Sequence, residues 1–349
     1  MKTYQNLINL GCVFLILLAA CKKNGSVTPE KPDTTSNVDP IVYVSGSTYD
    51  SVTTKWHAIY WKNANPVVLN NDDNVSSANA IAVNGNDVYA AGYTTADNAN
   101  IYIATYWKNG AQVNLTNASG RALASAIAIQ GNDVYIAGSV NALAVYWKNG
   151  QLVNLPLLPN MTVASTSGIA VQGTDVYVSG YQYGATGGPS AVYWKNGVPV
   201  KLPANQMVYA GTNMVVQNGH TYIPAAYVQA SAQSTIPNYW KDGQPVSLAD
   251  GSLIINAASI DVNGNDVYVA CGTTKGGAYF KNSKITLLSG SDAEIAGIKV
   301  FNNDVYASGQ STHEKKSEAT YWKNNVPVYL TSSIGKAGYG SAIAVIASK

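Results

Sequence analysis

Charged residues are scarce in this chain of 349 residues, since they make up 11 % of it against 46 % hydrophobic residues. The formal net charge is +2, Arg121 is the one arginine, and the lysines are spread along the chain. Proteins that bind nucleic acid concentrate lysine and arginine in one region. The charge distribution therefore argues against a nucleic-acid partner.

Cysteine is rare too, and two of the three cysteines lie in an N-terminal targeting segment. Residues 7–20 form an apolar run of signal-peptide length, too short for an ordinary membrane-spanning helix. The run ends in Leu18-Ala19-Ala20-Cys21, which resembles the lipobox of bacterial lipoproteins. The resemblance implies cleavage before Cys21 and attachment of a diacylglycerol to its thiol. Once Cys21 is lipidated, Cys271 is the only cysteine of the mature chain with a free thiol, so no internal disulfide can form.

The sequence also lacks a recognisable catalytic or cofactor motif. The three histidines are scattered without a metal-ligand spacing, and no serine sits in a Gly-x-Ser-x-Gly elbow. Five aspartates recur at one position of a repeated turn, which marks them as turn formers: Asp87, Asp133, Asp175, Asp266 and Asp304. We therefore expect no enzyme, no metal and no cofactor. Calcium at Asp72, Asp73 and Asp97 is the alternative, with solvated loop carboxylates as the default.

An aromatic pair is the most regular feature of the sequence. It recurs 40 to 47 residues apart, a spacing typical of propeller blades. The pairs are Tyr60-Trp61, Tyr106-Trp107, Tyr146-Trp147, Tyr193-Trp194, Tyr239-Trp240, Tyr279-Phe280 and Tyr321-Trp322. Because every repeat carries the pair, we expect it in the core between blades and not at a ligand.

Each repeat carries four short strand signals, for example at residues 126–129, 134–138, 144–148 and 152–155. Asn149-Gly150, between the last two, is typical of a tight hairpin turn. The array begins at residues 41–46 with a second-strand segment and ends at residues 341–345 with a first-strand segment. The sequence thus predicts an all-β fold: a seven-bladed β-propeller of four-stranded antiparallel blades, closed by a C-terminal strand that completes the first blade.

This array resembles the kelch and WD-repeat propellers in architecture, without matching the repeat signature of either family. Single glycines such as Gly92 stand where kelch repeats have a glycine doublet, and lysine follows the aromatic pair where WD repeats have aspartate. The expected organisation is a signal peptide at residues 1–20, a lipidated cysteine and tether at 21–40, and the propeller at 41–349.

Loop length indicates where a ligand would bind. The first-to-second and third-to-fourth connections are short and share one rim, because successive strands alternate in direction. The other connections vary and share the opposite rim, which we call the variable rim; variable loops on a rigid scaffold usually carry binding groups. Aromatic and charged residues on this rim are candidate ligand contacts, with cover of loop backbone as the plainer alternative: Trp56, His57, Arg121, Tyr181, Tyr183, Tyr209 and Tyr339.

Two charged residues occupy an alanine position of the first strand in successive repeats. Asp261 and Lys299 stand where sister repeats have alanine, as at Ala128. A buried charge needs a partner, so we expect a structural ion pair between them near the channel. We expect a monomeric, non-catalytic lipoprotein of the cell envelope, held to the membrane by its lipid, that binds a glycan or protein on the variable rim. The alternatives are a carbohydrate-active or other hydrolase, and a structural part of an outer-membrane assembly.

Overall fold

The computed structural model describes residues 39–70, 74–96, 100–185, 188–203, 208–227, 239–248, 254–289, 292–332, 334 and 337–348. They belong to one compact unit, Asp39–Lys349. Within these residues the regular structure is 29 strands, and no helix is long and apolar enough to cross a membrane. The expected signal peptide and Cys21 lie outside the described residues, as do Asp72, Asp73 and Asp97.

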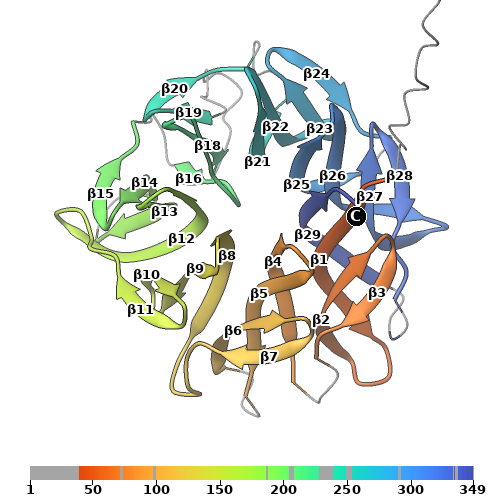
Figure 1. The fold of residues 1–349 in the computed structure, drawn as a ribbon, viewed down its shortest axis with the longest axis horizontal. Coiled ribbons are helices and arrows are strands. Elements are labelled where there is room, and N and C mark those ends of the chain that lie inside the picture. Colours follow the sequence, from red (N-terminus) through yellow and green to blue (C-terminus); the bar gives the residue numbers. More distant parts are fainter. Residues whose placement is uncertain are drawn as a thin grey trace, which may run out of the picture. The chain divides into compact units, whose positions relative to one another are not determined.

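Seven antiparallel sheets form the blades of a propeller and follow one another around a central axis in chain order (Figure 1). We number the blades 1 to 7, beginning with the sheet of order β29-β1-β2-β3. The fifth blade differs from the others because its first strand is split into two pieces, β16 and β17. The predicted fold class is confirmed.

The strands are given from blade 1 to blade 7. The first strands are β29 (Ala337–Ile346), β4 (Ser76–Asn84), β8 (Ala122–Gln130), β12 (Met161–Gln172), β16 (Val208–Ala210) with β17 (Val215–Gln217), β21 (Ile254–Asn263) and β25 (Glu294–Phe301). The second strands are β1 (Ile41–Asp50), β5 (Asp87–Thr95), β9 (Asp133–Val140), β13 (Asp175–Gly184), β18 (His220–Tyr227), β22 (Asp266–Thr273) and β26 (Asp304–His313). The third strands are β2 (Lys55–Lys62), β6 (Tyr102–Lys108), β10 (Leu143–Lys148), β14 (Ser190–Lys195), β19 (Tyr239–Lys241), β23 (Gly276–Lys281) and β27 (Lys316–Lys323). The fourth strands are β3 (Asn65–Val68), β7 (Ala111–Asn114), β11 (Gln151–Asn154), β15 (Val198–Lys201), β20 (Gln244–Val246), β24 (Lys284–Leu287) and β28 (Val326–Tyr329).

The ring closes by pairing the two ends of the propeller. Strand β29 runs antiparallel to β1, with Ile343 opposite Val44 and Val345 opposite Val42. All four of these side chains are buried. The pairing covers the edge that β1 would otherwise expose, so closure contributes both ladder hydrogen bonds and apolar burial.

The repeated tryptophan supplies the core between blades. Each of the six is at most 1 % exposed, and Phe280 takes the same place in blade 6 at 3 % exposure. Trp194 illustrates the packing, because it belongs to one buried cluster with residues of the preceding blade such as Ala126 and Tyr135. Its indole N–H donates to the Pro156 carbonyl, 2.8 Å away, just after the last strand of that blade. The tyrosines of the pairs are only partly buried in most blades.

A repeated polar cluster stabilises the rim that carries the short first-to-second and third-to-fourth connections, which we call the short-turn rim. In blade 3 the Lys148 ammonium lies 3.0 Å from the Asp133 carboxylate, and the Asn149 amide donates to the same carboxylate at 2.7 Å. Asn149 has a φ of 49°, so the asparagine also suits the turn. Blades 2, 4, 6 and 7 repeat the ion pair. The recurring aspartates are therefore partners of the repeated lysine as well as turn residues.

Candidate ligand site at the channel mouth

The first strand of each blade lies nearest the central axis and is called the inner strand (Figure 1). A β-bulge interrupts it at one repeated position. In blade 3, Ala124 pairs with Gly138 and Ala126 pairs with Ala137, so Ser125 is an extra residue with no partner of its own. Blades 1, 2, 4, 6 and 7 have the same shift at the equivalent place. A bulge bends its strand and redirects the extra side chain, so the position recurs for a geometric reason.

The bulge also explains the repeated glycine of the second strand. A Cβ on Gly138 would overlap the Leu123 carbonyl oxygen and approach Trp147 Cζ3 to 2.6 Å. Gly46, Gly92, Gly180 and Gly309 would overlap the equivalent carbonyl in their blades. Cys271 stands at this position in blade 6, opposite Ala257, where a side chain is accommodated. Its thiol is fully buried, and this burial raises the pKa of Cys271 to about 12.

Blade 5 replaces the bulge with a complete break of the inner strand. Residues 211–214 separate β16 from β17, and Pro224, which lacks an amide hydrogen, lies on the paired strand opposite the break. Thr212 turns toward blade 6 instead, and its amide donates to the Ala258 carbonyl at 2.7 Å. Thr212 thus takes the place of a bulge residue in this blade.

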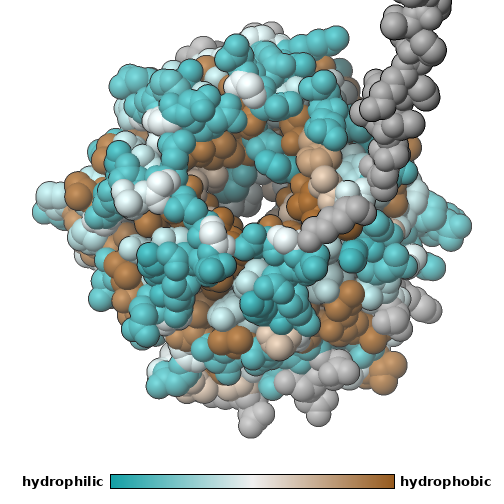
Figure 2. Space-filling view, viewed as in Figure 1, coloured by the Kyte–Doolittle hydropathy of each residue, from teal (hydrophilic) through white to brown (hydrophobic). Residues whose placement is uncertain are grey.

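The seven residues at this position form what we call the bulge ring, one residue from each blade. From blade 1 to blade 7 they are Ser341, Asn79, Ser125, Ser167, Thr212, Ala258 and Ala296. All seven line one open cavity of about 520 Å³. In blades 1, 2, 3, 6 and 7 this residue lies in the half of the inner strand nearer the variable rim, so the cavity is the channel mouth on that rim. Figure 2 shows the central opening of the ring, with hydrophilic and hydrophobic residues on its border.

Two tyrosines and no charged side chain complete the described lining of this mouth. Tyr181 on β13 and Tyr339 on β29 both border the cavity, together with Ile295 and small residues. Tyr181 also meets Tyr183 edge to face, with ring centroids 5.8 Å apart. Burial raises the pKa of Tyr339, so its phenol remains neutral at physiological pH. The mouth is therefore an uncharged pocket of hydroxyl, amide and aromatic groups.

A second cavity of about 230 Å³ continues the channel toward the short-turn rim. Asn79, Thr212, Ala296 and Ser341 border both cavities. The deeper one is mostly apolar, and its charged lining residues are Asp261 and Lys299.

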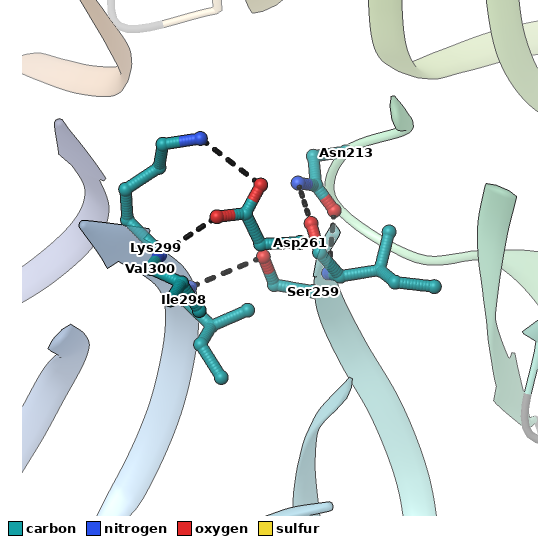
Figure 3. A network of polar contacts seen from close by, with 7 residues as sticks. Asn213, Ser259, Asp261, Ile298, Lys299 and Val300 are labelled. Atoms are coloured by element: carbon teal, nitrogen blue, oxygen red, sulfur yellow. Dashed lines mark hydrogen bonds and ion pairs between the residues drawn. The ribbon is translucent and has the colours of Figure 1, made fainter. Parts of the chain in front are cut away.

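Asp261 and Lys299 join blades 6 and 7 (Figure 3). Lys299 Nζ lies 3.0 Å from Asp261 Oδ1, and the Val300 amide donates to Asp261 Oδ2 at 2.7 Å. The Asp261 side chain is 6 % exposed and that of Lys299 is 42 % exposed. Asn213 adds two hydrogen bonds with the Ile260 backbone across the seam between blades 5 and 6. These polar contacts connect three blades around the deeper channel.

Only part of the predicted ligand set meets at the channel mouth. Tyr181 and Tyr339 line it, and Tyr183 touches Tyr181. Trp56 is 39 % exposed and packs against Tyr49, outside the cavity lining. The Tyr209 side chain lies outside the described residues.

His57 is wrong as an exposed rim contact, because it is 1 % exposed. Neighbouring residues of a strand point to opposite faces, so the exposed Trp56 places His57 on the buried face of β2. Its Nε2 lies 3.2 Å from Thr53 Oγ1, and its Nδ1 has no hydrogen-bond partner.

Arg121 is exposed on the variable rim, just before β8, and it does not line the cavity. Its guanidinium lies 4.6 Å from the Tyr102 ring centroid, and Tyr102 in turn contacts Tyr93. The stacking holds the guanidinium over an aromatic ring. No group of three or more histidine, cysteine or acidic residues with metal-binding geometry occurs in the part of the chain that the structure describes.

The bulge ring was not anticipated from the sequence. Its signal is a polar or small residue two positions before the isoleucine of six first strands, as in Asn79 before Ile81 and Ser125 before Ile127. The recurring glycine of the second strand is the other half of that signal.

No protein-family model and no curated protein matches this chain. Among solved structures, TolB from Acinetobacter baumannii aligns with a TM-score of 0.45 and 9 % identity over 86 % of this chain and 66 % of TolB. Apo AztD from Citrobacter koseri aligns with a TM-score of 0.44 and 12 % identity over 89 % of this chain and 99 % of AztD. The acylaminoacyl peptidase of Pyrococcus horikoshii aligns with a TM-score of 0.48 and 12 % identity over 84 % of this chain and 52 % of the peptidase. This chain thus spans about two thirds of TolB and about half of the peptidase. Identities this low transfer neither a ligand nor an activity, and the expected likeness to kelch and WD propellers stays a prediction.

Proposed function

We propose that this protein is a non-catalytic lipoprotein of the cell envelope that binds a neutral glycan in the channel mouth of its propeller. The observation that carries the proposal is the cavity of about 520 Å³, to which every blade contributes lining residues. Its size lies within the range of small-molecule sites, roughly 300–1000 Å³. The convergence of seven blades on one opening provides a concave site on a rigid scaffold.

The chemistry of the lining favours a neutral sugar over a charged ligand. Tyr181 and Tyr339 offer aromatic rings against which the C–H face of a sugar can pack. Hydroxyl and amide groups of the bulge ring offer hydrogen bonds to sugar hydroxyls. The described lining carries no carboxylate, whereas glycoside hydrolases use a pair of them, so binding without hydrolysis is the better fit.

A glycan array probed with the purified full-length protein in detergent tests the binding. We expect signals from neutral glycans that Tyr181→Ala and Tyr339→Ala reduce by about tenfold or more, the cost of losing an aromatic contact of about 1.4 kcal/mol. Trp56→Ala is the matched control, since it removes an exposed aromatic of the same rim outside the cavity. Equal losses in Trp56→Ala and the tyrosine variants would contradict a site at the mouth.

The proposed membrane attachment depends on Cys21, at the end of the lipobox-like segment. The thiol carries a diacylglycerol, and residues 22–40 tether the propeller to the membrane. Mass spectrometry of the protein from a bacterial envelope should show an N-terminal peptide beginning at Cys21 with the lipid mass. Cys21→Ser should lose that mass and leave the membrane fraction. Membrane retention of Cys21→Ser would contradict the anchor, independently of the glycan result.

A further inference from the structure

The bulge ring is divided into a polar arc and an apolar arc. The polar arc runs over five consecutive blades, 1 to 5, and consists of Ser341, Asn79, Ser125, Ser167 and Thr212. The apolar arc covers blades 6 and 7 and consists of Ala258 and Ala296, with Ile295 beside them in the cavity lining. Because the polar residues are consecutive around the ring, one side of the mouth offers hydrogen bonds and the other offers C–H surface.

The polarity of the ring is not a requirement of the fold. Blades 6 and 7 form the same bulge with alanine that blades 1 to 4 form with serine or asparagine. The scaffold therefore tolerates either kind of side chain at this position. A residue that faces a ligand can differ in side chain from blade to blade while the backbone stays the same, as it does here.

Three side chains of the polar arc already donate hydrogen bonds to other groups of the protein. Thr212 Oγ1 donates toward the Ala258 and Ala296 carbonyls at 3.0 and 3.2 Å. Ser125 Oγ donates to the Ala137 carbonyl at 3.2 Å, which leaves Thr166 to donate to Ser125 across 2.8 Å.

Asn79 follows the same pattern in part. Its Nδ2 donates to the Ala124 carbonyl at 2.9 Å, while its Oδ1 accepts from Ser77 at 3.1 Å. The oxygens of these three side chains keep lone pairs, so Asn79, Ser125 and Thr212 present mainly acceptors to a ligand. A ligand with hydroxyl or N–H donors on that side matches them.

From these observations we infer that the bulge ring determines ligand specificity and orientation: the sugar turns its hydroxyl edge toward blades 1 to 5 and its C–H face toward Ala258 and Ala296. This inference rests on the proposed function and names the residues that select the ligand. Ser167 and Ser341 are its clearest tests in the polar arc, because their substitution leaves the cross-blade hydrogen bonds of Asn79, Ser125 and Thr212 intact.

The test is a calorimetric titration of the full-length protein in detergent with the methyl glycosides of glucose, galactose, mannose and N-acetylglucosamine, each used singly. For the glycoside that binds most tightly, Ser167→Ala and Ser341→Ala should each raise Kd about threefold to tenfold, since each removes a hydrogen-bonding group from the polar arc. Ala258→Ser and Ala296→Ser should raise Kd about fivefold or more, because each places a hydroxyl against the C–H face. Ser190→Ala on β14 is the matched control, outside the cavity lining, and should leave Kd unchanged.

The outcomes separate the inference from the proposed function. If Tyr181→Ala abolishes binding while the arc variants bind like the unchanged protein, the site stands and the arc inference is overturned. Tighter binding by Ala258→Ser or Ala296→Ser also overturns it. If none of the four glycosides binds and the array gives no signal, both the function and the inference fail. Thermal unfolding of each variant shows whether a change in Kd reflects the site, since the serine and alanine exchanges should leave the melting temperature nearly unchanged.

Discussion

Lys299 and Asp261 occupy equivalent positions on neighbouring inner strands, and they meet across the seam with 3.0 Å between Nζ and Oδ1. Each lies opposite a tyrosine of the second strand of its own blade, Tyr306 and Tyr268 respectively. The Asp261 side chain is nearly fully buried and also accepts the Val300 amide hydrogen, whereas the Lys299 side chain is 42 % exposed in the channel. The pair therefore makes a directional link between blades 6 and 7 at a position where blades 1 to 4 have alanine.

Breaking this pair should cost stability unequally from its two sides. Asp261→Ala strands the Val300 amide and should lower the free energy of unfolding by about 2–4 kcal/mol. Lys299→Met should cost less, roughly 1–2 kcal/mol, because the lysine is partly exposed and Asp261 keeps its hydrogen bond from the Val300 amide. The double variant should lose less than the sum of the two. Urea unfolding of all three measures the coupling, and strict additivity would contradict a specific pair.

The bulge predicts a severe effect for a small substitution. Gly138→Ala should destabilise the protein by about 3 kcal/mol, because its Cβ would overlap the Leu123 carbonyl and press on Trp147. Cys271→Ala is the matched control at the same ladder position of blade 6, and we expect it to cost about 1 kcal/mol or less. Equal effects in urea unfolding would show that the bulge does not impose the glycine.

Ring closure predicts that the last strand contributes directly to stability. Ile343→Ala on β29 should lower the free energy of unfolding by about 2–4 kcal/mol, since the side chain is 9 % exposed and packs between the first and last blades. Val326→Ala, which is 63 % exposed on an outer strand, should change it by less than about 0.5 kcal/mol. Thermal unfolding measures both, and a neutral Ile343→Ala would contradict closure by β29.

The lysine–aspartate clusters predict loss of stability in acid. Hydrogen bonding by Asn149, followed by Lys148, holds the pKa of Asp133 below its usual value, and the clusters of four other blades do the same. A lowered pKa in the folded state means that this stabilisation is complete above the unfolded-state pKa of about 3.9 and disappears as pH falls through the folded value. The urea midpoint should therefore fall steadily below about pH 4. Asp133→Asn should make the urea midpoint fall less steeply with pH. An unchanged dependence on pH would contradict a stabilising role of these clusters.

Much of the architecture was predictable because it repeats. The spacing of the aromatic pairs indicates the blades, and the unpaired segments at the two ends of the array indicate the closure that β29 and β1 make. Sequence equivalence also suggested that Asp261 and Lys299 lie in neighbouring blades. These inferences depend only on position within a repeat, which a single sequence displays.

The site was less predictable, because it depends on deviations from the regular strand. We expected His57 on the exposed rim. Because neighbouring residues of a strand face opposite sides, the exposed Trp56 is followed by a buried His57. The bulge ring was missed because a strand pattern does not show an extra unpaired residue, although that residue redirects Ser125 and its equivalents into the mouth.

The most direct test of the site is a crystal structure of the protein soaked with the methyl glycoside that binds it most tightly. We expect the sugar in the mouth cavity, in contact with Tyr181 or Tyr339 and with its hydroxyls on the side of Ser167 and Ser341. A sugar seated at Trp56 or on the outer wall, with the mouth empty, would contradict it.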